Sequence, residues 1–302
     1  VWWSRILLAP FESLDPLMTK GPIRRQLVGQ RTLEGGGFPV RRPFPVPGCD
    51  QVDPFLLLDE MGPKHWHPGE AIGAPEHPHR GFETITYLLS GSMVHEDSTG
   101  TCAHLAPGGV QWMTAGSGVI HSELPSPDFL ESGGLLHGFQ LWVNLPKSKK
   151  MLPARYQGMT SEEIPTLEGP GYTLRVIGGE ILGLRSPVRT EIPITYAHLS
   201  LGSMGRLKLP LPADQPTHLY PFQGQVTIEG HMVEEGTFVS LEALQAAEIT
   251  AGSDGLECLI LAAKPLHEPM VRYGPFVMNS RHELIAAIED YQAGRLTDVP
   301  PS

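Results

Sequence analysis

The sequence has few cysteines, and they are widely spaced. Three cysteines, Cys49, Cys102 and Cys258, occur in 302 residues, and no two of them form a C-x-x-C motif. This count argues against a disulfide framework, a cysteine-ligated zinc site and a dithiol redox centre. Because disulfides are rare in the cytosol, we expect three reduced thiols in a cytoplasmic protein.

Clustered positive charge and long apolar runs are also lacking. The formal net charge is −11, and lysines gather only within residues 147–150, so no basic stripe is available for a nucleic acid duplex. We therefore predict no direct nucleic acid binding, while binding to a protein partner stays open. No stretch approaches the roughly 20 apolar residues of a membrane span, and the N-terminal apolar run ends at Pro10 without a cleavage motif. We expect a soluble, cytoplasmic chain.

Glycine (34 residues) and proline (30 residues) are abundant and spread along the chain. Between them lie short segments rich in β-branched and aromatic residues, which are typical of strands. Segments this short, with turns every few residues, indicate an all-β barrel or sandwich. The expected strands of the first half are residues 55–58, 84–91, 93–98, 103–105, 110–114 and 136–145, and a second β-rich block covers residues 172–263.

A weak internal repeat suggests two copies of one barrel. Tyr87-L-L-S-Gly91 resembles Tyr220-P-F-Q-Gly224, and each is a strand that runs into a glycine turn. Residues 146–165 are rich in proline and lysine and are read as a linker, while residues 1–40 are read as irregular. The expected domains are therefore residues 1–150 and 151–302.

One helix is predicted at the C-terminal end. Ser280 and Glu283 match a capping box, and apolar residues follow at helical spacing. Gly294 is placed to end the helix, as glycine does at many helix C-termini.

Two pairs of potential metal ligands stand out. In an extended strand, side chains two residues apart point to the same face, so His77 and His79 form one pair and His121 and Glu123 form another. About 40 residues separate the pairs, and an antiparallel barrel can bring both to one opening. Three imidazoles and one carboxylate suit a divalent first-row metal.

A single H-x-H pair is weak evidence, and the chain contains a second one as an internal comparison. His65 and His67 also lie two residues apart, but they sit among prolines and a glycine with no strand after them. Isolated motifs of this kind have a high false-positive rate. The combination of two strand-linked pairs is the stronger signal, so the four residues above form the predicted site.

The stretches around these pairs resemble the signature of the pirin family, a bicupin group. The resemblance rests on H-P-H-R-G-F-E-T-I-T-Y-L-L-S-G (77–91), on M-x-H-E-D-S (93–98) and on G-G-V-Q-W-M-T-A-G-S-G-V-I-H-S-E (108–123). It extends to segments 55–63, 140–146, 155–157 and 274–280, and thus to most of the chain beyond about residue 20.

This resemblance implies two tandem cupin (jelly-roll) barrels with a short C-terminal helix. It also implies a non-haem Fe(II) in the N-terminal barrel, held by His77, His79, His121 and Glu123. Other divalent metals (Mn, Co, Ni, Cu or Zn) are chemically acceptable to the same ligands. In general cupins the first motif supplies the carboxylate, here at Glu83, and the turn before the last histidine is shorter. Both departures are pirin features.

The second barrel is expected to hold no metal. Aligning Tyr87 with Tyr220 puts Pro210 and Pro212 at the first histidine pair, and a second alignment puts Glu248 and Thr250 at the other pair. Proline offers no ligand atom, and no H-x-H occurs in residues 165–302. The second barrel is therefore read as a partner that shapes the first.

Other residues near the site have weaker assignments. Glu83 and His95, with its neighbours Glu96 and Asp97, are candidates for orienting the metal-binding imidazoles, which usually need such partners. For each, a purely structural role is the alternative. Arg80 is read as a surface residue, although pairing with Glu83 or with an anionic substrate is open. The substrate-binding residues are unknown at this stage.

Two functions follow from the resemblance. Some pirins resemble quercetin 2,3-dioxygenases, which cleave a flavonol with both atoms of dioxygen and release carbon monoxide. Here Glu123 would serve as metal ligand and as acceptor of the flavonol hydroxyl proton. The alternative is a non-enzymatic, iron-dependent regulator that binds a protein partner such as a transcription factor complex or a metabolic enzyme.

Overall fold

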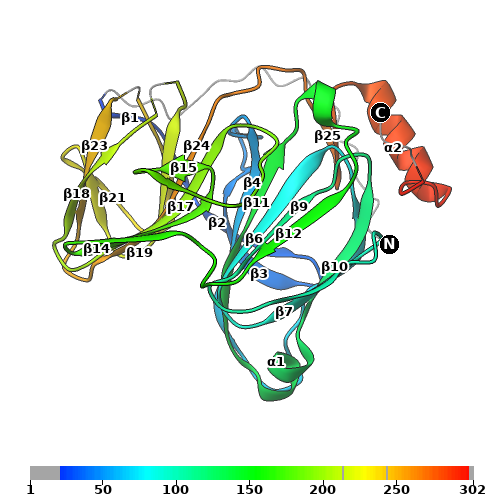
Figure 1. The fold of residues 1–302 in the computed structure, drawn as a ribbon, viewed down its shortest axis with the longest axis horizontal. Coiled ribbons are helices and arrows are strands. Elements are labelled where there is room, and N and C mark those ends of the chain that lie inside the picture. Colours follow the sequence, from blue (N-terminus) through cyan, green and yellow to red (C-terminus); the bar gives the residue numbers. More distant parts are fainter. Residues whose placement is uncertain (1–20, 213, 243, 299–302) are drawn as a thin grey trace.

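The computed structural model describes residues 21–212, 214–242 and 244–298, which form two β-barrels side by side (Figure 1). The N-terminal apolar run on which the expectation of no signal peptide depends lies outside these residues. Within them, no helix is long and apolar enough to cross a membrane.

The first barrel consists of a seven-stranded sheet and a four-stranded sheet. The larger sheet has the order β12 (Arg155–Met159), β9 (Val110–Thr114), β6 (Phe82–Ser90), β11 (Gly134–Asn144), β4 (Phe55–Trp66), β3 (Phe38–Phe44) and β2 (Gln30–Glu34). The smaller sheet has the order β5 (Ala74–His79), β10 (Val119–Pro125), β7 (Met93–Asp97) and β8 (Cys102–Leu105). The strands within these two sheets pair antiparallel. The short helices α1 (Pro127–Ser132) and η1 (Lys147–Lys149) lie in connections.

The second barrel repeats this plan. Its larger sheet has the order β1 (Ile23–Val28), β22 (Thr237–Leu241), β19 (Thr217–Gln223), β24 (Leu256–Ala263), β17 (Ile194–Leu201), β14 (Tyr172–Gly178) and β13 (Thr166–Gly169). Its smaller sheet has the order β18 (Arg206–Pro210), β23 (Ala246–Ala251), β20 (Val226–Ile228) and β21 (His231–Val233). Tyr87 and Tyr220 fall on the corresponding strands β6 and β19, so the predicted internal repeat is confirmed.

Two strands are exchanged between the halves of the chain. β1 precedes the first barrel in sequence but pairs with β22 of the second, while β12 follows the first barrel and completes its sheet beside β9. The expectation of irregular structure over residues 1–40 is therefore wrong from Ile23 onward, where β1, β2 and β3 occur. The predicted linker likewise contains η1 and β12. The domain boundary near residue 150 stays a prediction, because each sheet takes a strand from across it.

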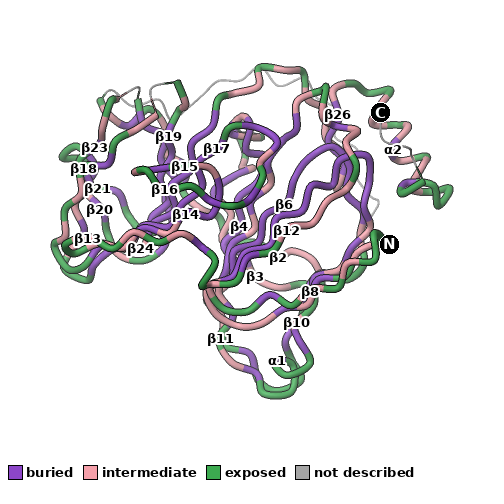
Figure 2. Tube along the Cα trace, viewed as in Figure 1, coloured by how far each residue is buried: buried purple, intermediate pink, exposed green. Residues whose placement is uncertain are grey.

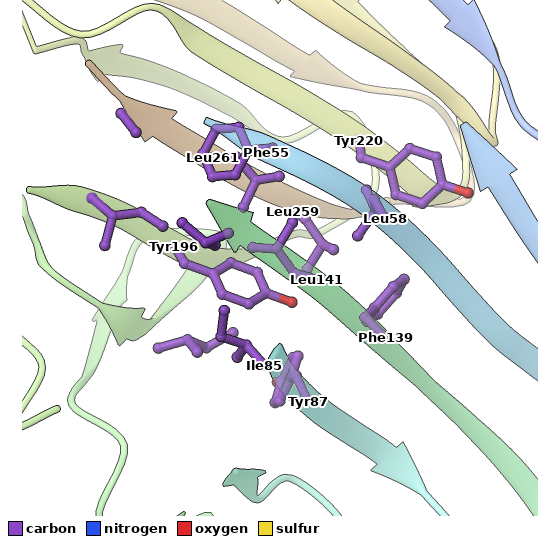
Figure 3. Packing of buried hydrophobic residues seen from close by; sticks show 14 of the residues in the cluster. Phe55, Leu58, Ile85, Tyr87, Phe139, Leu141, Tyr196, Tyr220, Leu259 and Leu261 are labelled. Carbon is purple, nitrogen blue, oxygen red and sulfur yellow. The ribbon is translucent and has the colours of Figure 1, made fainter. Parts of the chain in front are cut away.

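The two large sheets pack against each other through a shared apolar core. Phe55, Ile85 and Leu141 of the first barrel are fully buried against residues such as Tyr196 and Leu259 of the second (Figure 3). Figure 2 shows the buried residues running along the strands where the barrels meet. Burial of apolar surface in this core is the main favourable contribution to the free energy that holds the two barrels together.

The C-terminal segment returns to the first barrel. The ribbon of β25 (Val271–Tyr273) and β26 (Phe276–Met278) leads into α2 (Arg281–Gln292), which lies at the outer edge of that barrel in Figure 1. One half of the capping box is confirmed, since the Ser280 side chain accepts a hydrogen bond from the Glu283 backbone. The Glu283 side chain accepts from the backbone N–H of Asn279 instead of Ser280. The C-terminal ribbon packs closely against the first barrel at Gly81. A side chain at this position, which has φ +92°, would collide with the Val277 carbonyl oxygen.

Candidate metal centre

Strands β5 and β10 bring three histidines together at one end of the first barrel. The strands pair antiparallel with His121 opposite His77, and His79 shares the face of His77 because it lies two residues along the strand. One ring nitrogen from each of the three lies within 4.8 Å of the others. Ring centroids are 4.4 Å apart for His77–His121 and 5.0 Å for His79–His121.

The hydrogen bonds of these rings leave two ring nitrogens without a partner among the described residues. His77 Nδ1 lies 2.7 Å from the Pro75 carbonyl oxygen, and His121 Nδ1 lies 3.4 Å from His95 Nδ1. In contrast, His79 Nδ1 and His121 Nε2 are buried without a hydrogen-bond partner among the described residues. Buried polar atoms are rarely left unsatisfied, and an ion bound between them would satisfy both. The residues present therefore fit a metal ion.

Electrostatics prepare the imidazoles for this role. Burial lowers the pKa of His79 well below its ordinary value, and the neighbouring His77 lowers it further. Burial also lowers the pKa of His121, with His79 as the next cause. Both rings are therefore neutral at pH 7 and keep the lone pair that a metal needs.

Glu123 shares the inner face of β10 but is held by hydrogen bonds. Its Oε1 accepts from Thr86 Oγ1 at 2.8 Å and from Gln111 Nε2, and its Oε2 accepts from Gln140 Nε2 at 2.8 Å. A carboxylate has about four acceptor positions, so one position on Oε2 stays open. The group of converging ligand atoms contains the three histidines without Glu123. Its role as a fourth ligand stays a prediction.

His95 touches the centre, while its role in orienting a ligand stays a prediction. It lies on β7 beside β10, is 1% exposed, and its Nε2 is 2.9 Å from Asp97 Oδ2. If Nε2–H donates to Asp97, then His95 Nδ1 accepts the proton of His121 Nδ1, and the lone pair of His121 is on Nε2. Burial opposes the charge of Asp97, but hydrogen bonds from His95 and Thr99 hold its pKa below the usual value.

Asp97→Asn should weaken metal binding about 10–100-fold, as is typical when a partner of a ligating histidine is lost. The amide would present a donor to His95 and disturb the orientation of both rings. Competition with a metal-binding dye measures the affinity. Glu96→Gln, on the same strand but exposed, is the matched control and should bind like wild type. Equal affinity in Asp97→Asn would show that His95 has no orienting role.

The structure does not bring Glu83 to the histidines. Thr86 reaches Glu123 from one face of β6, and side chains alternate along a strand, so Glu83 points to the opposite face with Ile85 and Tyr87. There its Oε1 accepts a hydrogen bond from Thr114 Oγ1 at 2.7 Å. Burial raises the pKa of Glu83 to about 7, against the hydrogen bonds it accepts.

Arg80 is buried, so the expectation of a surface residue is wrong. Its Nη1 forms an ion pair of 2.9 Å with Asp290 on α2, and its Nη2 donates to the Leu296 carbonyl oxygen at 3.1 Å. Its Nε donates to the Ser117 carbonyl oxygen in the A-G-S-G turn. The arginine next to His79 thus anchors the C-terminal helix to the barrel.

The centre opens onto a cavity of about 720 Å³, which is within the range of small-molecule sites. The sequence did not predict that the C-terminal segment forms one of its walls. Part of that segment, 274–280, carries the family resemblance without indicating a role in the site. The residues that line the cavity include His77, His79, Glu123, Gln140, Trp142 and Arg272.

The second barrel has an apolar interior in place of the histidines. On the strands that correspond to β5 and β10, Leu207 faces Ile249 and Leu209 faces Ala247, and these side chains pack into the barrel core. Glu248, the position aligned with His121, is exposed instead. Among the described residues, no other group of three potential ligands converges, so the pair His65 and His67 is not part of one.

Comparison with known proteins agrees with the two-barrel plan. The pirin family model matches residues 37–143, and the model of the pirin C-terminal cupin domain matches residues 196–297. A protein of Pseudomonas aeruginosa, named provisionally as a quercetin 2,3-dioxygenase, is 41% identical over 277 residues. The match covers 89% of this chain and 95% of that protein.

Solved structures give the same result. The crystal structure of a quercetin 2,3-dioxygenase from Acinetobacter baumannii is 34% identical with a TM-score of 0.83, and the match covers 91% of this chain and 98% of that chain. The Escherichia coli pirin YhhW in complex with nickel(II) is 20% identical with a TM-score of 0.61, and the match covers 80% of this chain and 98% of that chain. At this identity the likeness shows the fold alone. The chain therefore belongs to the pirin family, with an N-terminal pirin domain and a C-terminal cupin domain.

Proposed function

We propose that this protein is a metal-dependent dioxygenase of the quercetin 2,3-dioxygenase type. The observation that carries the proposal is the set of three converging imidazoles, His77, His79 and His121, in the first barrel, two of which line a cavity of about 720 Å³. The names of the relatives from Pseudomonas and Acinetobacter support the reaction class.

The metal proposed for this site is iron(II), held by the three histidines with Glu123 as the fourth ligand. Nitrogen and oxygen donors of this kind accept several first-row ions, and the nickel(II) in the Escherichia coli relative agrees with a site for divalent metals. When bound, such an ion supplies a position for a substrate oxygen and for dioxygen.

Glu123 is proposed to act at its one open acceptor position, on Oε2. That position serves either the metal or the proton of the flavonol hydroxyl group, so the two roles exclude each other at any moment. Gln140 fixes the carboxylate because its amide donates to Glu123 Oε2 and accepts a hydrogen bond from Trp142 Nε1 at 2.9 Å. A base held this firmly costs little reorganisation during proton transfer.

Trp142 is proposed to form the aromatic surface for the substrate. The centre of its ring lies 5.1 Å from that of the His79 ring and 4.6 Å from that of the Phe82 ring, so packing fixes its position beside the metal site. A flat substrate packed against the indole gains apolar burial and a favourable ring contact. The same contact excludes water from the space above the imidazoles.

Protein loaded anaerobically with iron(II) is expected to consume one dioxygen per quercetin and to release one carbon monoxide. An oxygen electrode and a haemoglobin-based carbon monoxide assay measure the two gases, and metal-stripped protein is the control. Full iron occupancy without oxygen uptake would end the flavonol proposal and leave regulation through a protein partner as the hypothesis to pursue.

A further inference from the structure

Arg272 is a cation with unused hydrogen-bond donors in the cavity wall. It lies on β25, in the C-terminal ribbon, and is only partly exposed. Its Nε lies 3.4 Å from the Gly274 carbonyl oxygen, and its Nη1 lies 3.3 Å from the Leu56 carbonyl oxygen, both long contacts. A guanidinium has five N–H donors, so the described residues use only a small part of its capacity.

Carboxylates act on Arg272 only from a distance. Asp59, Glu34 and Asp50 favour its charged form, but Asp59 and Glu34 pair with Arg42, whose Nη2 is 2.5 Å from Asp59 and 2.7 Å from Glu34. Among the described residues, no carboxylate forms an ion pair with Arg272. Burial and the neighbouring Arg42 lower the pKa of Arg272 to about 10, which still leaves it charged at neutral pH. Holding such a cation in a partly buried position costs free energy unless something pairs with it.

Arg272 is placed beside the metal centre. Its guanidinium carbon is 4.8 Å from the centre of the Trp142 ring, and the same ring lies 5.1 Å from that of His79. Arg272, Trp142 and His79 line one cavity. Because the guanidinium lies over the Trp142 ring, a flat molecule beside these two side chains can reach the histidines at one edge and the guanidinium at another.

We propose that Arg272 is the anion-binding residue of this cavity and selects aromatic ligands that carry a carboxylate or an ionised phenol. This deepens the proposed function and rests on it in one respect, namely that the cavity is the substrate site of the metal centre. The guanidinium supplies a planar pair of donors that matches a carboxylate, and it carries out no chemistry itself. It is thus a specificity-determining residue.

The probes for the test are 2-naphthoate and 2-naphthamide, which share one flat ring system and differ in charge. Wild-type protein is expected to bind 2-naphthoate about tenfold or more tighter than the amide, the range of a charge-assisted hydrogen bond. Quenching of tryptophan fluorescence, checked by calorimetry, measures both affinities. The measurement is made on metal-loaded and on metal-stripped protein, because a carboxylate can also bind the metal.

Arg272→Gln should bind both probes equally, through loss of affinity for 2-naphthoate alone. Arg272→Met keeps an apolar side chain over Trp142 and should behave in the same way, which covers the case that one variant folds poorly. Arg206→Gln is the matched control, because Arg206 is exposed on β18 of the second barrel, and it should keep the preference.

Three results would overturn the proposal: equal binding of the two probes by wild type, a preference that survives in Arg272→Gln and Arg272→Met, or a preference that disappears when the metal is stripped. The last would place the carboxylate on the metal. The outcome is separate from that of the dioxygenase assay. A preference that depends on Arg272, without oxygen uptake on quercetin, would sustain the anion site and reject only the flavonol reaction.

Discussion

His121→Ala is expected to abolish metal binding at the first barrel and, with it, any metal-dependent oxygen consumption. His121 is opposite His77 in the β5–β10 ladder. Its Nε2 is one of two buried imidazole nitrogens that lack a hydrogen-bond partner in the described part of the chain. Loss of a ligand should exceed the 10–100-fold loss in affinity that follows loss of an outer partner, so we expect more than about 100-fold. Metal content after dialysis against a weak chelator measures the effect.

His67→Ala is the matched control for this prediction. His67 is an exposed histidine in the other H-x-H pair and lies outside the converging group. It should retain one metal per chain with wild-type affinity. Undiminished metal content in His121→Ala, or an equal loss in His67→Ala, would place the metal elsewhere in the molecule.

Glu60→Ala should lower the free energy of unfolding by about 3–5 kcal/mol, the cost of breaking a buried ion pair. The Glu60 carboxylate is completely buried and accepts hydrogen bonds from Arg41 Nε at 2.8 Å, Tyr220 Oη at 2.6 Å and His137 Nε2 at 3.1 Å. Tyr220 belongs to the second barrel, so this network joins the two. The substitution removes the acceptor of Tyr220 and His137. It leaves the Arg41 cation with Glu235, a 48% exposed side chain, as its remaining ion-pair partner among the described residues.

Urea unfolding measures this effect, with Glu180→Ala as the comparison. Glu180 also pairs with an arginine, Arg185, at 2.6 Å, but the side chains are 49% and 79% exposed. Exposed pairs contribute at most about 1 kcal/mol, so this variant should be nearly as stable as wild type. Similar losses in the two variants would show that the Glu60 network does not hold the barrels together.

Much of the first barrel could be predicted because its signals are local. The strand expected at 84–91 is found at Phe82–Ser90, and that at 110–114 is found at Val110–Thr114. The capping box located α2 because its hydrogen bonds lie within four residues. The side-chain period of a strand was also sufficient to predict that His77 and His79 share a face. For the second pair, a register shift between His121 and Glu123 interrupts the regular ladder with β5.

What the sequence could not show depends on contacts between distant segments. The orientation of Glu83 was hidden because β6 is buried on both faces, so its residues lack the alternation that reveals an inner side. Strand β1 was missed because its partner β22 lies some 200 residues away. The same holds for Arg272, which enters the cavity only because the C-terminal ribbon returns to the first barrel.

Anomalous X-ray scattering from crystals loaded with iron(II) would locate the metal in the first barrel. One strong peak per chain is expected at the iron edge, within bonding distance of His77, His79 and His121, and no peak is expected in the second barrel. Glu123 within bonding distance would confirm the fourth ligand. Full loading with the peak at any other place, or with no peak among the three histidines, would show that these histidines do not hold the metal.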